Sequence, residues 1–147
     1  MATEKNRLFT PEQEKIVTDA IKQAEQNTSG EIRVHVENYD KDDVLDRAAY
    51  WFAKLEMHKT KERNGVLFYL AVDARKFAIL GDAGINSKVP EGFWNEIKDT
   101  MVEYFKQGKF AEGLAKGILM AGEQLKKYFP HQKDDINELS DEISYDD

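Results

Sequence analysis

Cysteine is absent from the 147-residue chain, which excludes disulfide bonds, thiolate nucleophiles and cysteine-based zinc sites. Histidine is almost as scarce, and His35, His58 and His131 include no pair at the spacing of a zinc motif. No apolar run approaches the roughly 18 residues that would span a bilayer, and residues 1–7 are polar rather than signal-like. We therefore expect a cytoplasmic protein with no membrane attachment.

Basic residues are in the minority: 21 lysines and arginines stand against 28 aspartates and glutamates, and the net charge is −7. Nucleic-acid binding needs a concentrated basic face, so we expect no nucleic-acid partner. Charged residues make up 33% of the chain and apolar residues 41%, proportions typical of a globular protein. The length suits one domain with its own core, and we expect a monomer.

The first predicted elements are a helix and a strand. Thr10 can cap a helix, Pro11 fits its first position, and Gln13 can reach back to the cap, while the polar residues 27–30 stop it. Residues 31–37 then alternate between apolar and polar side chains, which predicts a half-buried strand near a sheet edge. His35 lies on the polar side of this strand and is expected to face solvent.

A second helix and two further strands follow. Asp40 can cap the helix, whose inward residues are expected to be Leu45, Ala48, Ala49, Phe52 and Leu55. Residues 65–71 are apolar on both faces, which predicts a central strand, parallel to the first through a right-handed crossover. Asp73-Ala74-Arg75 is too short for another crossover, so residues 76–80 must return antiparallel beside it.

Two apolar stripes predict two more helices before Pro130. The stripes comprise Phe93, Trp94, Ile97, Met101 and Phe105 in the first helix, and Leu114, Ile118, Leu125 and Phe129 in the second. Gly113 and Gly117 lie one turn apart and would allow close approach to a neighbour. We predict a single α/β domain over residues 10–130, with a small mixed sheet and about four helices. Residues 1–9 form an N-terminal extension, and residues 131–147 an acidic tail that is either mobile or a loosely docked arm.

The predicted topology brings three segments, 28–31, 63–65 and 81–84, to one end of the sheet. They carry Glu31, Asn64 and Asp82, whose oxygens suit a hard cation such as Ca²⁺ or Mg²⁺. Arg63, together with Lys59 and Lys61, could contact a phosphate group. The alternative is that these segments are ordinary turns, since Asn-Gly before a strand is common in turns. No histidine lies in the three segments, and His58 is interpreted as a loop residue.

A second acidic cluster falls at the opposite end of the sheet. Asp40, Asp42, Asp43 and Asp73 lie near the ends of the first two strands, where open α/β sheets commonly bind ligands. The aspartates at positions 40–43 also fit the start of a helix, where capping and the helix dipole both favour acidic side chains. This cluster is therefore the second choice for a metal site.

Four short motifs in this order resemble the TPM domain family, which includes phosphatase-like, photosystem-repair and receptor-modulating proteins. The motifs are Thr28-Ser29-Gly30-Glu31-Ile32, Arg63-Asn64-Gly65-Val66-Leu67, Gly81-Asp82-Ala83-Gly84-Ile85, and the turn at residues 105–110 leading into Gly113-Leu114 and Gly117-Ile118. The resemblance implies a three-layer α/β/α sandwich, divalent-metal binding and phosphatase activity. It points to Glu31, Asn64 and Asp82 as metal ligands.

Two functions fit these observations. The first is a Ca²⁺- or Mg²⁺-binding TPM-like domain that acts as a binding or regulatory module, with a protein or a small phosphorylated molecule as partner. The alternative is a weak metal-dependent phosphomonoester hydrolase, in which the metal activates water and Arg63 stabilises charge on the phosphoryl group. The catalytic residues of such an enzyme are not assigned by the sequence.

Overall fold

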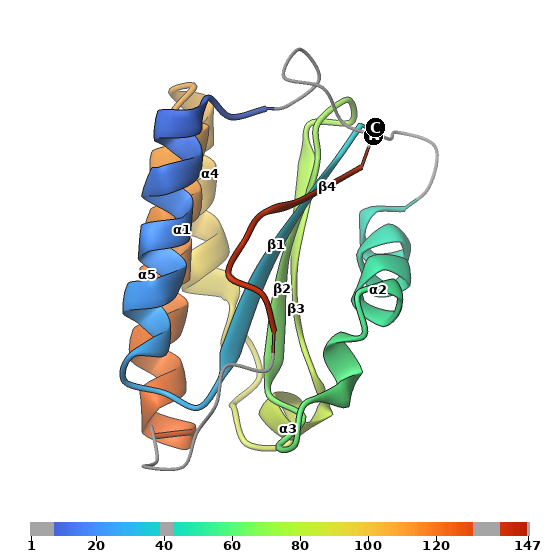
Figure 1. Cartoon of the computed structure of the whole chain (residues 1–147), viewed down its shortest axis with the longest axis vertical. Coiled ribbons are helices and arrows are strands. Elements are labelled where there is room, and N and C mark those ends of the chain that lie inside the picture. The colour runs from blue at the N-terminus through green and yellow to red at the C-terminus, as the bar shows by residue number, and fades with distance from the viewer. Residues whose placement is uncertain (1–7, 39–42, 131–138, 147) are drawn as a thin grey trace.

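The computed structural model describes residues 8–38, 43–130 and 139–146 (Figure 1). Its elements are α1 (Pro11–Glu25), β1 (Glu31–Glu37), α2 (Val44–Lys54), a short 3₁₀ helix (Met57–Lys59), β2 (Gly65–Ala71), β3 (Lys76–Gly81), α3 (Ala83–Asn86), α4 (Asn95–Lys106), α5 (Phe110–Tyr128) and β4 (Ser144–Asp146). Helices α1, α4 and α5 cover one face of the sheet and α2 covers the other, as Figure 1 shows. The predicted three-layer sandwich is confirmed, with the four-residue α3 as an additional helix.

The sheet has the strand order β3-β2-β1-β4. Strands β1 and β2 are parallel, with Glu31 opposite Gly65, and β3 pairs antiparallel with β2, with Gly81 opposite Val66. This confirms the predicted mixed sheet. All seven residues of β2 are buried, as expected for a strand covered on both faces.

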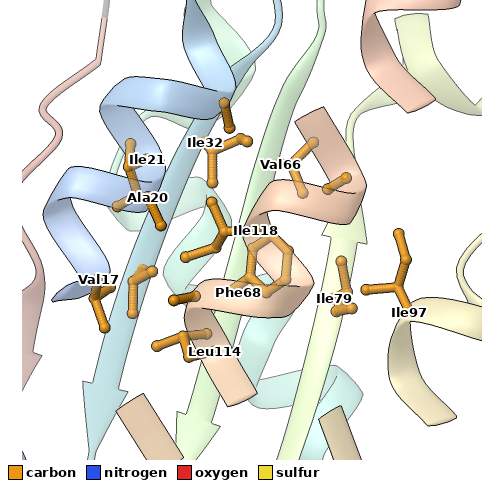
Figure 2. Packing of buried hydrophobic residues seen from close by; sticks show 14 of the residues in the cluster. Val17, Ala20, Ile21, Ile32, Val66, Phe68, Ile79, Ile97, Leu114 and Ile118 are labelled. Atoms are coloured by element: carbon orange, nitrogen blue, oxygen red, sulfur yellow. The ribbon is translucent and has the colours of Figure 1, made fainter. Parts of the chain in front are cut away.

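The larger core lies between the sheet and helices α1, α4 and α5. The predicted capping box at Thr10 and Gln13 is present and starts α1, so that Val17, Ala20 and Ile21 face the sheet. Figure 2 shows how side chains from the sheet and from the three helices that cover it meet in this core; the labelled ones are Val17, Ala20, Ile21, Ile32, Val66, Phe68, Ile79, Ile97, Leu114 and Ile118. Their burial is the main favourable term in folding this half of the molecule.

Helices α4 and α5 pack very closely where α5 carries glycine. A Cβ atom built on Gly113 would lie 2.6 Å from Cβ of Tyr104, and one on Gly117 would lie 2.5 Å from Sδ of Met101. The predicted close approach at these glycines is thus confirmed. Tyr104 Cβ is held by the backbone of α4 and cannot move aside, whereas the flexible Met101 side chain can.

The smaller core lies under α2, and here the predicted inward face is partly wrong. Ala48 and Trp51 are the buried residues of α2, whereas Leu45 is 51% exposed and Ala49 is also exposed. A polar contact explains the difference. The indole nitrogen of Trp51 donates a hydrogen bond of 2.9 Å to the buried Glu37, and this bond sets the rotation of the helix on the sheet.

Strand β1 lies next to the edge strand β4, near a sheet edge as predicted, but it is not the half-buried strand that its alternation predicts. Its polar face is buried as well, with His35 at 0% and Glu37 at 1% exposure. Trp51 of α2 stacks on His35 and donates to Glu37 on this face, and β4 pairs in parallel with β1 from His35 to Glu37. Of the two alternatives for the acidic C-terminus, residues 139–146 are a docked arm (the C-terminal arm), while residues 131–138 lie outside the described residues.

We expect Gly113→Ala to destabilise the domain although alanine is the better helix former. The added methyl group must displace the backbone of α4, and overpacking of this kind costs about 1–3 kcal/mol, against a propensity gain of at most about 1 kcal/mol. Urea denaturation measures the difference, with the exposed Lys116→Ala on the same helix as control. A Gly113→Ala protein at least as stable as the control would contradict the close packing.

Candidate functional site

The three segments predicted to converge do meet at the end of the sheet where β1 and β2 begin. The backbone N–H of Glu31 donates to the carbonyl of Asn64 at 3.2 Å, and that of Asp82 to the carbonyl of Gly65 at 3.0 Å. The N–H of Gly84 donates to the carbonyl of Arg63 at 2.8 Å. The backbone therefore forms one continuous hydrogen-bonded platform at this end.

Asp82 and Arg63 form the central ion pair of the platform. The guanidinium donates from Nε and Nη2 to the two carboxylate oxygens at 2.8 and 2.9 Å, a bidentate arrangement. One of these oxygens also accepts from the N–H of Ala83 at 2.7 Å, so Asp82 caps α3. Asp82 is buried and Arg63 is half-exposed, which leaves the arginine as the group that can move.

Glycine at position 84 makes this pair possible. A Cβ atom there would lie 2.2 Å from the carbonyl oxygen of Glu62 and 2.6 Å from that of Arg63. Arg63 itself has a φ of 53°, in the left-handed region that favours glycine. The start of α3 therefore presses directly on a tight turn, and this contact brings Arg63 to Asp82.

Asn64 belongs to a second polar cluster, which includes a residue that the sequence interpretation does not assign. Its side-chain nitrogen donates to Ser29 Oγ and to Glu62 Oε2, each at 3.2 Å. Ser29 Oγ donates to the same Glu62 oxygen at 2.6 Å. Glu62 is exposed and precedes Arg63 in the sequence. Its position in this turn is the sequence feature that could have identified it as a site residue.

Glu31 points to a third set of partners. It is 3% exposed, and its Oε1 accepts a 2.6 Å hydrogen bond from the N–H of Leu139 in the C-terminal arm. Between Glu31 and Asp82 stands Gly65, and the space where its side chain would be is filled by Met57 and Leu139. The structure thus brings the three predicted residues to one end of the sheet, but gives each carboxylate its own partner.

The donor set decides which cations fit. Among residues 8–38, 43–130 and 139–146, no group of three or more histidine or acidic side chains lies close enough to hold a metal. A Ca²⁺ or Mg²⁺ site here would rest on one or two carboxylates, with amide, carbonyl and water oxygens completing the shell, as is common for Mg²⁺. The platform has these oxygen types at Asp82, Asn64 and Glu62.

A shallow pocket of about 270 Å³ opens beside the ion pair. It is lined by Ala49, Phe52, Ala53, His58, Arg63, Leu80, Gly81 and Asp82. The short 3₁₀ helix brings His58 into this pocket, although no histidine lies in the three converging segments. An arginine, a carboxylate and a histidine on one exposed pocket can bind an anion and transfer protons.

In the second-choice acidic cluster at the other end of the sheet, Asp43, and not the predicted Asp40, is the N-cap of α2. Asp43 accepts hydrogen bonds from the N–H groups of Leu45 at 2.9 Å and Asp46 at 3.4 Å. Asp73 is exposed in the β2–β3 turn. Asp40 and Asp42 lie outside the described residues.

A buried polar network under α2 was not predicted. The Glu37 carboxylate accepts from Arg47, Trp51 and Tyr69, with the closest Arg47 contact at 2.6 Å. Burial by itself would raise the pKa of Glu37, but hydrogen bonds from Arg47, Tyr69 and Trp51 outweigh it and lower the pKa. Glu37 is therefore ionised and fully paired, a structural tie between β1, β2 and α2.

His35 connects this network to the C-terminal arm. Its ring stacks on Trp51 with centroids 3.9 Å apart, and Nδ1 lies 3.0 Å from Ser144 Oγ. Burial lowers the pKa of His35 to about 4, so the ring is neutral at pH 7. His35 therefore does not face solvent, and the expectation from the sequence is wrong. The expectation failed because the sequence does not reveal that the C-terminal arm covers β1.

The C-terminal arm is also held by a pair of carboxyl groups. Glu25 at the end of α1 accepts a 2.8 Å hydrogen bond from the N–H of Ile32 and is hydrogen-bonded to Asp141. Burial and the Asp141 contact, with the nearby charge of Glu31, raise the pKa of Glu25 to about 9. At neutral pH Glu25 is therefore protonated and can donate to Asp141.

This proton makes stability depend on pH. Between pH 4.5 and about 9 the unfolded chain has released the Glu25 proton and the folded chain retains it, so the free energy of unfolding falls as pH rises. We expect Glu25→Gln to flatten this decline, because the amide can still accept from Ile32 and donate to Asp141. Urea denaturation from pH 6 to 9 measures it, with the amide signal of Leu139 reporting on the arm.

The exposed Glu91→Gln is the matched control, since it makes the same carboxyl-to-amide change in a loop. An equal pH dependence in Glu25→Gln and Glu91→Gln would show that Glu25 carries no proton at pH 7.

The layers and strand order define a three-layer α/β/α domain with a mixed four-stranded sheet and a polar platform at one end. The chain matches the family model of the TPM domain over residues 3–124 and belongs to that family. None of its described helices combines the length and hydropathy needed to cross a bilayer.

Solved structures similar to the chain include the following two. The NMR structure of the BA42 protein from the psychrophilic bacterium Bizionia argentinensis is 49% identical, with a TM-score of 0.91 over 99% of this chain and 100% of that one. The N-terminal domain of a protein from P. gingivalis is 23% identical, with a TM-score of 0.69 over 85% of this chain and 82% of that one, and shows the fold alone. No curated protein sequence matches the chain.

Proposed function

We propose that this TPM domain is a non-catalytic binding module that takes Ca²⁺ or Mg²⁺ at the polar platform. The observation that carries the proposal is the buried Asp82 carboxylate, which borders an exposed pocket and is neutralised only by the half-exposed Arg63 among its described partners. Asn64 and Glu62 lie on the adjoining turn and supply further oxygens. A hard cation prefers this all-oxygen set.

Arg63 occupies the position of the competing cation. Its guanidinium and a divalent cation both neutralise Asp82, so cation binding would loosen the ion pair and turn Arg63 toward solvent. The released guanidinium could then pair with an acidic group of a protein or with a small phosphorylated molecule. Cation binding and partner binding would be coupled through this single side chain.

Glu31 has a different place in the proposal. Its carboxylate is bound by the C-terminal arm, and Met57 and Leu139 separate it from Asp82. It would join a cation only after the arm is displaced, so we assign the first binding step to Asp82 and Asn64.

The test is a Ca²⁺ and Mg²⁺ titration followed by calorimetry and residue-resolved NMR. We expect Asp82→Asn, which retains an oxygen to cap α3, to lower cation affinity about tenfold or more. Arg63→Gln should raise affinity, because it removes the competing charge. Asp73→Asn, an exposed carboxylate at the other end of the sheet, is the matched control and should leave affinity unchanged.

The two variants must change affinity in opposite directions. A loss of affinity in Arg63→Gln, or equal affinities for Asp82→Asn and Asp73→Asn, would contradict the proposed competition. Shifts confined to the amides of Glu31 and Leu139 would move the cation to the arm, and shifts around Asp43 would move it to the opposite end.

The pocket beside Asp82 favours one alternative, a weak metal-dependent phosphomonoester hydrolase. Arg63 could bind the phosphoryl oxygens, and His58 lines the same pocket and could transfer a proton to the leaving group. A bound metal would supply activation of the attacking water.

In this alternative Arg63 contributes to activity, whereas in the binding module Arg63 competes with the cation. With an aryl phosphate and Mg²⁺, Arg63→Gln and His58→Gln should each lower kcat/KM by about tenfold or more. Lys88→Gln, an exposed cation on a neighbouring loop, is the control. Turnover that is equal in all three variants, or indistinguishable from buffer, would exclude the hydrolase and leave the binding module.

A further inference from the structure

A second pocket, of about 600 Å³, lies at the end of the sheet opposite Asp82. It opens between the end of β2, the start of β3 and the turn joining α4 to α5, at the top of Figure 1. Its volume falls within the roughly 300–1,000 Å³ typical of small-molecule sites. Neither the polar platform nor its pocket shares a residue with it.

The interior of this pocket is apolar. Phe77 and Phe105 pack edge to face with centroids 5.2 Å apart, and Phe110 follows 5.4 Å beyond Phe105. The remaining apolar wall consists of Leu8, Leu70, Ala71, Val72 and Val102. Phe110 is 40% exposed, so the aromatic wall continues from the core to the surface, where a folded protein normally places polar groups.

The mouth of the pocket is basic. Arg75, Lys76 and Lys106 line it. Lys106 lies 3.7 Å from Glu103, but no described residue forms a salt bridge with Arg75 or Lys76. Acidic side chains also lie at this end of the sheet: Asp73 is exposed in the same turn, and Asp43 caps α2. Two exposed cations that form no salt bridge with a described residue, at the mouth of an apolar pocket, favour an anionic ligand.

Helix α5 adds to the positive potential at this mouth. The helix starts at Phe110, and its N-cap residue Lys109 makes no side-chain capping hydrogen bond. The first N–H groups of this 19-residue helix, and the positive end of its dipole, therefore lie beside the pocket without a side-chain cap. Glu112 in the first turn offsets part of this field.

We propose that this pocket binds a free fatty carboxylate. The alkyl chain would lie along Leu70, Phe77 and Phe105, and the carboxylate would pair with Arg75 and Lys76 at the mouth. Apolar burial supplies affinity, and the charge at the mouth selects an anion over a neutral or cationic amphiphile. The inference is independent of the cation site, since the two lie at opposite ends of the sheet.

The test uses dodecanoate, kept below its micelle-forming concentration and titrated into the full-length chain. We expect NMR shifts confined to the end of β2, the start of β3 and the α4–α5 turn. The double substitution Arg75→Gln/Lys76→Gln should weaken binding about tenfold or more. Its matched control is Lys22→Gln/Lys116→Gln, which removes the same charge from exposed positions on α1 and α5 and should leave binding unchanged.

Two further measurements make the proposal falsifiable. Dodecyltrimethylammonium should bind at least about tenfold more weakly than dodecanoate if the mouth selects an anion; equal binding would show a non-specific apolar surface and overturn the proposal. Val102→Trp, which fills the pocket without changing charge, should abolish binding while thermal unfolding confirms the fold. Binding only to phosphatidylglycerol vesicles, and not to monomeric dodecanoate, would also overturn it.

Discussion

The four-residue connection between β2 and β3 determines where the polar groups of this domain meet. A crossover to a parallel strand needs a dozen residues or more, so β3 must return antiparallel. Asp82 then lies beside the start of β2 rather than at the far end of the sheet. Every feature of the polar platform, from the Arg63 ion pair to the capping of α3, depends on this reversal.

The face under α2 has a different origin. Glu37 is ionised although it is buried, because three side chains donate to its carboxylate. Removing one partner of such a group typically costs about 3–5 kcal/mol, so the network fixes α2 on the sheet firmly. His35 extends the same network to the C-terminal arm through Ser144. The arm is therefore part of the folded unit from residue 139 to residue 146, and it covers the edge of β1 and the Glu31 carboxylate.

The two ends of the sheet have opposite characters, and this shapes the functional proposals. One end combines buried carboxylate and amide oxygens with a half-exposed arginine, a composition suited to a hard cation and an acidic partner. The other end combines an aromatic wall with exposed cations that form no salt bridge with a described residue, a composition suited to an amphipathic anion.

The sequence by itself determined the elements whose signals are local. The capping box at Thr10, the doubly apolar β2 and the short β2–β3 turn each depend on neighbouring residues, and together they predict the mixed sheet and the three converging segments. Tertiary structure alone decided the rest. Residues far apart in the sequence, such as Glu31 and Leu139, meet only after folding. Such contacts bury β1, although its alternating sequence is typical of a half-exposed strand. Glu31, Asn64 and Asp82 lie at one end of the sheet, but their side chains point to separate partners. The direction of a side chain does not follow from the fact that its backbone lies beside another segment.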